Sequence, residues 1–293
     1  MTTTTQLPNW RIWILAARPQ TLIASLSPVI LGSALAAKKQ SFHLPLFLCI
    51  LLAALGIQIG TNLANDYFDF LKGADTPQRK GPIRVSQAGL LSLAKVKKGF
   101  IIAFSLSALL SFYLILKGGF VIAALACVSI LCGIIYTAGP YSIAYLGLGE
   151  CFVFFFFGPL ATAFTAFLQM GYFSLQGFVL GVAPGALSCC ILIVNNLRDV
   201  EEDLLANKKT LVVRFGTLFG KGEYLFFQCL AATSLFYFQN TSPSFIIAFL
   251  LLSFLVTFPL FQKSAPPAYN ALLKRNALFL AIYTILGSLM VFV

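Results

Sequence analysis

The chain is poor in acidic side chains, with only nine Asp and Glu among 293 residues, against 20 Lys and Arg. It has a single histidine, and none of its seven cysteines is spaced as a CxxC metal-ligand pair. The cysteines are therefore interpreted as small apolar residues of the core. A separate basic, water-soluble domain is absent too, so the net charge of +11 does not indicate binding to nucleic acid.

Apolar residues, in contrast, make up 59% of the chain, and the mean hydropathy is +0.90. Apolar runs of about 20 residues recur, which is the length a helix needs to cross a bilayer. Because backbone groups inside a bilayer must be satisfied within each span, the spans are helices. We predict an all-α integral membrane protein with about nine transmembrane helices around a central cavity. The predicted spans cover roughly 12–37, 44–65, 99–116, 119–138, 147–168, 174–196, 224–240, 244–262 and 275–293.

The basic residues orient these spans. With the N-terminus inside, only Lys38, Lys39 and Lys117 of the 20 Lys and Arg fall on outside loops. Such a bias is typical of cytoplasmic loops. The sequence therefore predicts a cytoplasmic N-terminus and places the loops after the second and sixth spans in the cytoplasm.

The acids concentrate in two regions, and only Glu150 lies apart from them. The second span ends in 62–69 (Asn-Leu-Ala-Asn-Asp-Tyr-Phe-Asp), and the sixth ends in 195–203 (Asn-Asn-Leu-Arg-Asp-Val-Glu-Glu-Asp). In both, an Asn precedes an Asp by four residues, and a second Asp follows three or four residues later. We interpret this as a single domain, 1–293, built from two related halves whose polar ends meet.

Each motif is suited to binding a cation. Residues three and four apart share one face of a helix, so the Asn and the two Asp of each motif form a stripe. Like charges at this spacing repel, and acids near a bilayer are functional candidates by default. Mg²⁺ takes one or two carboxylates together with substrate phosphates. The stripes therefore predict Mg²⁺ bound across a diphosphate; the alternative is two solvated helix ends with local salt bridges.

A basic loop follows each motif, 79–84 after the first and 208–214 after the second. Such cations bind phosphate oxygens and steady a leaving diphosphate, although basic residues belong on cytoplasmic loops in any case. We expect the phosphate role for Arg84 and Lys209, and a purely topological role for Lys97. Glu150 enters a span without a nearby Lys or Arg, so it is either a structural hydrogen-bond anchor or a cavity residue.

Several segments together resemble the UbiA superfamily of intramembrane aromatic prenyltransferases, in particular its menaquinone branch, which prenylates 1,4-dihydroxy-2-naphthoate. The segments that carry the resemblance are 18–22 with 28–29, 65–75, 81–84 with 89, 136–150 and 195–216. The chain departs from the general superfamily pattern at Gly73, where a third Asp is usual. The nearby Asp75 is therefore left without an assigned metal role.

The resemblance implies an allylic polyprenyl diphosphate donor held through Mg²⁺. It further implies transfer of the polyprenyl group to 1,4-dihydroxy-2-naphthoate with loss of diphosphate and CO₂, giving demethylmenaquinol for menaquinone biosynthesis. The location it implies is the bacterial inner (cytoplasmic) membrane, with the active site open to the cytoplasm. The implied catalytic and metal-binding residues are Asp66, Asp69, Asp199 and Asp203. The implied substrate-binding residues are Asn62, Asn65, Arg84, Asn195, Lys209, Arg18 and Tyr136. For Arg18 the alternative is an interfacial side chain that extends to the membrane surface.

Other functions stay open on the sequence. The acceptor can be an isomeric dihydroxynaphthoate or 4-hydroxybenzoate. A transporter is a more distant alternative, but it would place acids at the bilayer midplane instead of at helix ends. A CDP-alcohol phosphotransferase also uses aspartates and Mg²⁺, but in one long motif with an Ala-Arg step that this chain lacks.

Overall fold

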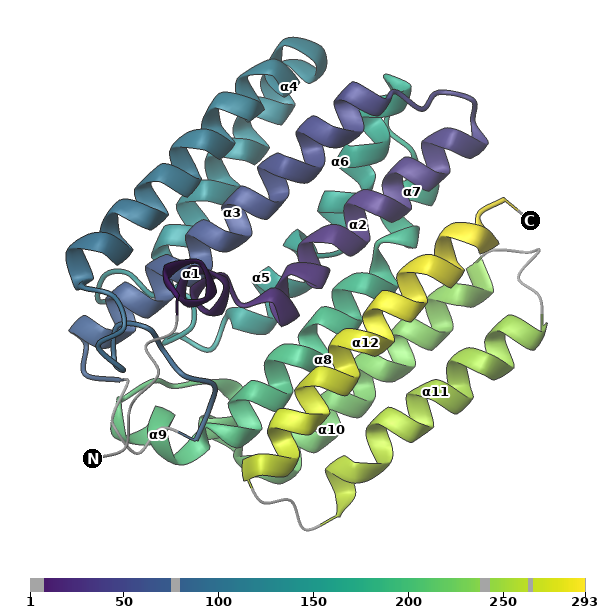
Figure 1. The fold of residues 1–293 in the computed structure, drawn as a ribbon. Helices are drawn as coiled ribbons and strands as arrows, with labels where there is room; N and C mark the ends of the chain where they lie inside the picture. The colour runs from purple at the N-terminus through teal and green to yellow at the C-terminus, as the bar shows by residue number, and fades with distance from the viewer. Residues whose placement is uncertain (1–7, 75–79, 238–242, 263–265, 293) are drawn as a thin grey trace.

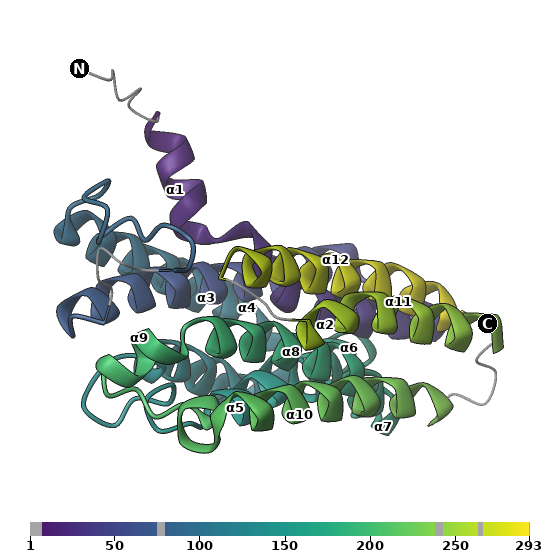
Figure 2. The ribbon, with the colours of Figure 1, turned by 90° about the horizontal axis from the view of Figure 1, so that it is seen from below.

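Helices form all of the regular secondary structure in the computed structural model, which describes residues 8–74, 80–237, 243–262 and 266–292. The predicted all-α class is thus confirmed for these residues, while Asp75 and Arg79 lie outside them. Figures 1 and 2 show the helices packed into one bundle. They are α1 (Asn9–Ala17), α2 (Pro19–Lys38), α3 (Leu44–Leu71), α4 (Leu93–Ile135), α5 (Gly149–Phe156), α6 (Pro159–Met170), α7 (Leu175–Leu180), α8 (Val182–Arg198), α9 (Val200–Leu205), α10 (Leu211–Ser234), the short 3₁₀ helix η1 (Leu235–Tyr237), α11 (Pro243–Phe261) and α12 (Pro266–Met290).

Seven segments in the described part of the chain are long and apolar enough to cross a membrane. Two of them join a pair of helices, α5 with α6 and α7 with α8. α4 is 43 residues long and changes direction at Gly119, whose φ of 69° and ψ of −157° are not helical. The predicted spans 99–116 and 119–138 form the two halves of this helix. Glycine suits the break because it adopts positive φ without steric cost.

The predicted first span, 12–37, is interrupted in the structure. Arg18 adopts a left-handed conformation, with φ 53° and ψ 71°, and ends α1 before Pro19 begins α2. The reason is steric, because the proline ring disfavours the α conformation in the residue that precedes it. As a result α1 projects away from the bundle, as Figure 2 shows. The seventh predicted span also differs: α10 begins at Leu211 and is broken at Gly216 (φ 86°, ψ 169°), so its longer part starts after Gly216 and not near residue 224.

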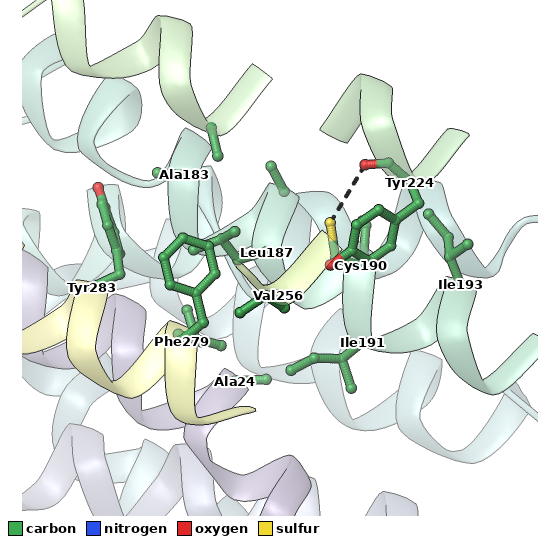
Figure 3. Packing of buried hydrophobic residues seen from close by; sticks show 14 of the residues in the cluster. Ala24, Ala183, Leu187, Cys190, Ile191, Ile193, Tyr224, Val256, Phe279 and Tyr283 are labelled. Atoms are coloured by element: carbon green, nitrogen blue, oxygen red, sulfur yellow. Dashed lines mark hydrogen bonds between the residues drawn. The ribbon is translucent and has the colours of Figure 1, made fainter. Parts of the chain in front are cut away.

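α8 is the central helix of the bundle. Of the seven candidate spans, the one that contains α8 is the most enclosed, with 78% of its most apolar window buried. Figure 3 shows apolar side chains of α8, such as Leu187 and Ile191, in one cluster with Tyr224 of α10 and Phe279 of α12. This packing holds the C-terminal end of α8, and the polar motif there, inside the protein.

The two polar motifs differ in their local structure. α3 continues to Leu71, beyond the predicted end at residue 65, so the whole first motif is helical. α8 instead ends at Arg198, and Asp199 (φ −96°, ψ 10°) separates it from the short α9. A kink at Asp199 thus interrupts the helix within the second motif, although N–H to carbonyl bonds of 3.0 and 2.8 Å still connect Asp199 to Asn195 and Asp203 to Asp199. Figure 1 shows α9 at the same end of the bundle as the end of α3.

Candidate active site

A cavity of about 350 Å³ lies where the ends of α3 and α8 approach each other. Residues of both polar motifs line it, together with the turn between α1 and α2, the loop after α3 and the start of α5. Most of the predicted site residues are brought together here. Those that line the cavity are Arg18, Asn62, Asn65, Asp69, Arg84, Tyr136, Asn195 and Asp199.

The other predicted site residues, Asp66, Asp203 and Lys209, do not line this cavity. Asp66 is 2% exposed and faces the loop after α3, where its two oxygens accept the backbone N–H groups of Val85 and Ser86 at 3.0 and 3.2 Å. Asp203 is also buried, whereas Lys209 is exposed.

The rest of the first motif points to the cavity. One oxygen of Asp69 accepts the hydroxyl of Tyr145 at 3.2 Å, and the other lies 3.5 Å from Nη2 of Arg84. The amide oxygen of Asn65 accepts the hydroxyl of Thr137 at 3.0 Å. The end of α3 is thereby tied to the loop after α3 and to the loop after α4, two segments that hydropathy alone does not relate.

Asn62 and Arg18 fix the turn between α1 and α2. The amide nitrogen of Asn62 donates to the carbonyl of Ala17 and to the hydroxyl of Thr21, both at 2.9 Å. The guanidinium of Arg18 donates to the backbone carbonyl of Asn62 at 3.3 Å. Arg18 is thus a cavity residue, and the left-handed backbone before Pro19 directs it there.

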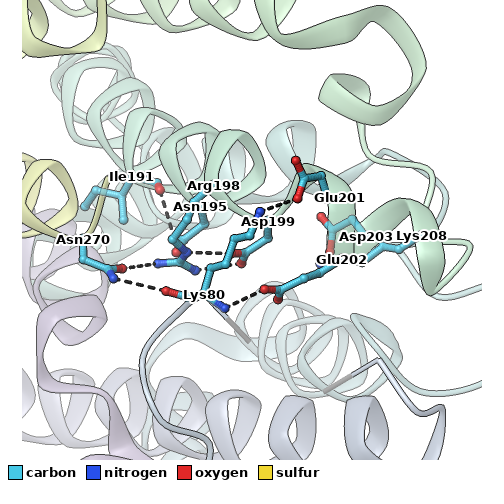
Figure 4. Close-up of polar contacts among 10 residues, drawn as sticks. All are labelled: Lys80, Ile191, Asn195, Arg198, Asp199, Glu201, Glu202, Asp203, Lys208 and Asn270. Carbon is cyan, nitrogen blue, oxygen red and sulfur yellow. Dashed lines mark hydrogen bonds and ion pairs between the residues drawn. The ribbon is translucent and has the colours of Figure 1, made fainter. Parts of the chain in front are cut away.

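The second motif is organised around Arg198, which is 4% exposed. Its guanidinium binds both carboxylate oxygens of Asp199, at 2.6 and 2.7 Å, and donates to the amide oxygen of Asn270 at 2.8 Å. Asn270 in turn donates to the backbone carbonyl of Lys80 at 3.3 Å, and Glu202 accepts the N–H of Lys80 at 2.6 Å. As Figure 4 shows, this network connects the second motif to the loop that follows the first.

Lys208, and not Lys209, is the lysine of the second loop that reaches the cavity. Its ammonium lies 3.1 Å from Asp203, and the charges of Asp69 and Asp199 also act on it. Burial lowers the pKa of Lys208, but the three carboxylates outweigh burial and raise it above its usual value. Burial raises the pKa of Asp203, and Lys208 opposes that rise.

A turn explains why Lys208 takes this position. Asn207 has a positive φ of 55°, and the N–H of Lys208 donates to the backbone carbonyl of Asp203 at 2.8 Å. The chain therefore folds back onto α9 at Lys208 and leaves Lys209 outside. Nothing in the sequence distinguishes these two adjacent lysines.

Tyr145 is a functional candidate that no pattern in the sequence indicated. Besides its bond to Asp69, its ring lies 3.9 Å from the ammonium of Lys72, and its backbone carbonyl accepts the N–H of Lys209 at 3.1 Å. Arg214 donates to the carbonyl of Leu146 at 2.8 Å. The loop after α4 therefore bridges the two motifs.

Glu150 lines the cavity and is 4% exposed. Its carboxylate accepts the side-chain amide of Asn196 at 2.7 Å, and its backbone carbonyl accepts the thiol of Cys189 at 3.2 Å. Both alternatives raised by the sequence therefore apply, since Glu150 is hydrogen-bonded to α8 and is also part of the cavity wall.

A second chamber of about 160 Å³ adjoins the cavity. Side chains from α2, α3, α4, α5 and α6 line it, and most of them are apolar. The two spaces share Gln58, Thr61, Tyr136, Val153 and Phe157. The cavity that contains the charged side chains and the more apolar chamber thus share part of their walls.

The chemistry of the donor set fits a hard cation such as Mg²⁺. Within the described residues no group of three His, Cys, Asp or Glu side chains stands close enough to hold a metal alone. Mg²⁺ does not need such a cage, because it commonly uses one or two carboxylates, waters and substrate phosphates. In addition, Oδ2 of Asp203 is buried without a hydrogen-bond partner, which is costly unless a cation or donor approaches it.

Comparison with known proteins identifies relatives along most of the chain. The model of the UbiA prenyltransferase family matches residues 25–289. A 1,4-dihydroxy-2-naphthoate octaprenyltransferase of Haemophilus influenzae is 37% identical over 231 residues, which is 76% of this chain and 75% of the relative. A protein of the same name from Mycobacterium tuberculosis is 33% identical over 255 residues, or 87% of this chain and 85% of the relative.

Solved structures share the fold. A UbiA homolog from Archaeoglobus fulgidus, bound to GPP and Mg²⁺, superimposes with a TM-score of 0.69 at 16% identity, covering 96% of this chain and 100% of that one. The apo structure of a UbiA homolog from Aeropyrum pernix K1 also gives 0.69, at 14% identity, covering 92% and 98%.

Proposed function

The chain belongs to the UbiA prenyltransferase family, and on that premise we propose that it transfers a polyprenyl group to 1,4-dihydroxy-2-naphthoate. The donor is an allylic polyprenyl diphosphate, and the reaction releases diphosphate and CO₂ to give demethylmenaquinol. Relatives that carry the name of this activity cover most of the chain. The protein thereby acts as an aromatic prenyltransferase in menaquinone biosynthesis.

The observation that carries the proposal is the convergence of both Asp motifs on one cavity. Asp69 and Asp199 line it from opposite halves of the chain, and Arg18, Arg84 and Lys208 line it with them. A diphosphate needs this combination of oxygen ligands for its metal and cations for its own oxygens.

The proposed ligands of Mg²⁺ are Asp66, Asp69, Asp199 and Asp203. When bound, the ion neutralises the diphosphate and makes it a better leaving group. Asp69 and Asp199 stand on the cavity wall, and Asp203 offers its unpartnered oxygen. Asp66 holds the loop that bears Arg84, and each of its oxygens keeps a further lone pair.

The basic residues bind the phosphate oxygens directly, and Arg84 and Lys208 are the proposed pair, with Arg18 beside them. Asn62, Asn65, Asn195 and Tyr136 orient the substrates, and Lys209 remains a proposed phosphate contact from the loop. The apolar chamber takes the polyprenyl tail and keeps water from the allylic cation, since its walls offer few polar partners.

We also propose nine membrane crossings within a single domain, 1–293. Counting the two halves of α4 separately and adding α10 extends the seven candidate segments to nine. The basic loops support a cytoplasmic N-terminus and a site open to the cytoplasm, and we propose the inner membrane of a bacterium as the location. The matching polar motifs at the ends of the second and sixth spans support two related halves.

Incubation of the purified protein with a polyprenyl diphosphate and 1,4-dihydroxy-2-naphthoate labelled in its carboxyl group tests the function. We expect labelled CO₂ and prenylated quinol in equal amounts. The isomeric dihydroxynaphthoates and 4-hydroxybenzoate serve as competing acceptors. If the protein prefers one of these compounds, that compound replaces 1,4-dihydroxy-2-naphthoate as the proposed acceptor. If it prenylates none of the acceptors, the proposed function is refuted.

A further inference from the structure

Glu150 links α5 to α8 through a hydrogen bond, but donor binding gives its carboxylate no role. It is 4% exposed, and within the described residues no Lys or Arg lies within ion-pairing distance of it. Its side-chain hydrogen bond comes from a neutral amide, that of Asn196. A buried carboxylate without an ion-pair partner is costly, which makes a functional role the first interpretation.

The surroundings of Glu150 place it at the junction of the polar cavity and the apolar chamber. Val153 follows it on α5, and Phe157 comes directly after the last residue of that helix; both side chains line both spaces. Residues three positions apart share one face of a helix, so Glu150 continues the wall to which Val153 belongs. Tyr136 stands beside it, because a Cβ added to Gly149 would meet the phenol oxygen at 3.0 Å.

This junction is where the reaction must occur. A donor with its diphosphate among Asp69, Asp199 and Lys208 and its tail in the apolar chamber has its first carbon between the two. The aromatic acceptor must meet that carbon there. Its hydroxyl group then comes within reach of the side chains that line the junction.

Resting on the proposed function, we propose that Glu150 is the catalytic base that takes the proton of the acceptor hydroxyl next to the reacting ring carbon. As the O–H electrons move into the ring, the carbon that bears the carboxylate bonds to the first carbon of the prenyl group. The bond from that carbon to the diphosphate oxygen breaks. The ring is left as a ketone whose carboxylate is β to the carbonyl group.

The second half of the step restores Glu150. The β-keto carboxylate loses CO₂, and the electrons of the broken C–C bond return to the ring oxygen. That oxygen takes the proton back from the Glu150 carboxyl group. No oxidant, reductant or external proton is needed, and the products are prenylated quinol, CO₂ and diphosphate. Asn196 holds Glu150 in place and steadies its charge through the 2.7 Å hydrogen bond.

The variant Glu150→Gln tests this role without removing the contact to Asn196, because the amide oxygen of Gln still accepts that bond. General base catalysis contributes about 10²- to 10⁴-fold. We therefore expect the single-turnover rate to fall at least about 100-fold. Donor binding and the thermal midpoint stay as in the wild type. Glu223→Gln is the matched control, a half-buried glutamate outside the cavity, and it keeps the wild-type rate.

A second acceptor separates a base from a structural residue. With the adjacent hydroxyl methylated, there is no proton to take, so the wild-type rate falls and Glu150→Gln lowers it no further. A structural role instead predicts the same fold-loss for Glu150→Gln with both acceptors, and that result overturns the inference. Near-normal turnover by Glu150→Gln overturns it as well. A wild-type protein that prenylates no hydroxyaryl acceptor is a different outcome, because it refutes the proposed function itself.

Discussion

The carboxylate of Asp66 accepts the backbone N–H of Val85 at 3.0 Å and so joins the end of α3 to the loop that follows it. The N–H of Ser86 binds the other oxygen at 3.2 Å. Both bonds are buried. The loop they hold carries Arg84, so Asp66 shapes the cavity that Asp69 lines one turn further on.

Replacing Asp66 therefore affects stability as well as activity. If Asp66 did no more than repel neighbouring carboxylates, Asp66→Ala would not destabilise the fold. The variant, however, leaves two buried N–H groups without an acceptor. Each costs about 1–3 kcal/mol. We expect Asp66→Ala to lower the thermal midpoint clearly and Asp69→Ala to lower it less, while both lose activity by orders of magnitude. Thermal unfolding in detergent and the transfer assay measure the two effects; equal midpoints would contradict the structural role of Asp66.

Lys208 and Lys209 are adjacent in the sequence, but only Lys208 reaches the cavity. Lys208→Met leaves the buried Asp203 without its cation, and breaking such a pair costs about 3–5 kcal/mol. It also removes a positive charge from the cavity. We expect a lower thermal midpoint and at least about tenfold lower activity for Lys208→Met, because a tenfold change needs only about 1.4 kcal/mol. Lys209→Met should retain its stability and lose less activity, and the reverse order would show that the turn at Asn207 differs from the one described.

The metal proposal predicts a strict need for a divalent cation. Excess EDTA should abolish turnover, and added Mg²⁺ should restore it. Mg²⁺ with the donor should also raise the thermal midpoint, because ligand at 100 times its dissociation constant stabilises a protein by about 2.7 kcal/mol. Asp69→Ala and Asp199→Ala should lose this rise, whereas Lys97→Ala, on the exposed start of α4, should keep it. Full turnover in EDTA would rule out the metal.

The apolar chamber predicts control of tail length. Ala161 lines it, so Ala161→Leu should shorten the preferred donor by filling space that the tail uses. Ala124→Leu, an exposed position on α4, is the control and should leave the preference unchanged. Competition between donors of several lengths measures the effect. If both variants prefer the same donor length, the tail does not lie in this chamber.

Orientation is open to chemical labelling. In a cysteine-free variant, Ala88→Cys and Asn207→Cys should react with a membrane-impermeant maleimide only from the cytoplasmic side. Lys39→Cys, between α2 and α3, should react only from the other side. All three positions are exposed. Labelling of Ala88→Cys and Asn207→Cys from opposite sides would contradict a common cytoplasmic site.

Local features of the sequence were sufficient to predict that this is a helical membrane protein and that the first motif forms one stripe on a helix. Apolar runs of bilayer length have no stable alternative to helices, because backbone groups in lipid must be satisfied within the span. The stripe of Asn62, Asp66 and Asp69 follows from the helical repeat alone, and α3 confirms it. The breaks at Arg18 and Gly119 also have local causes, a following proline and the freedom of glycine.

The tertiary structure decided which side chains meet. Tyr145 reaches Asp69 across 76 positions, and Asn270 reaches Lys80 across 190, so no periodicity relates them. The turn at Asn207 selects Lys208 over Lys209 because it is held by a contact to Asp203, and the kink at Asp199 interrupts a helix that spacing alone predicts as continuous. Sequence spacing determines the faces of single helices, whereas contacts between distant segments depend on how the whole bundle packs, and packing determines the wall of the site.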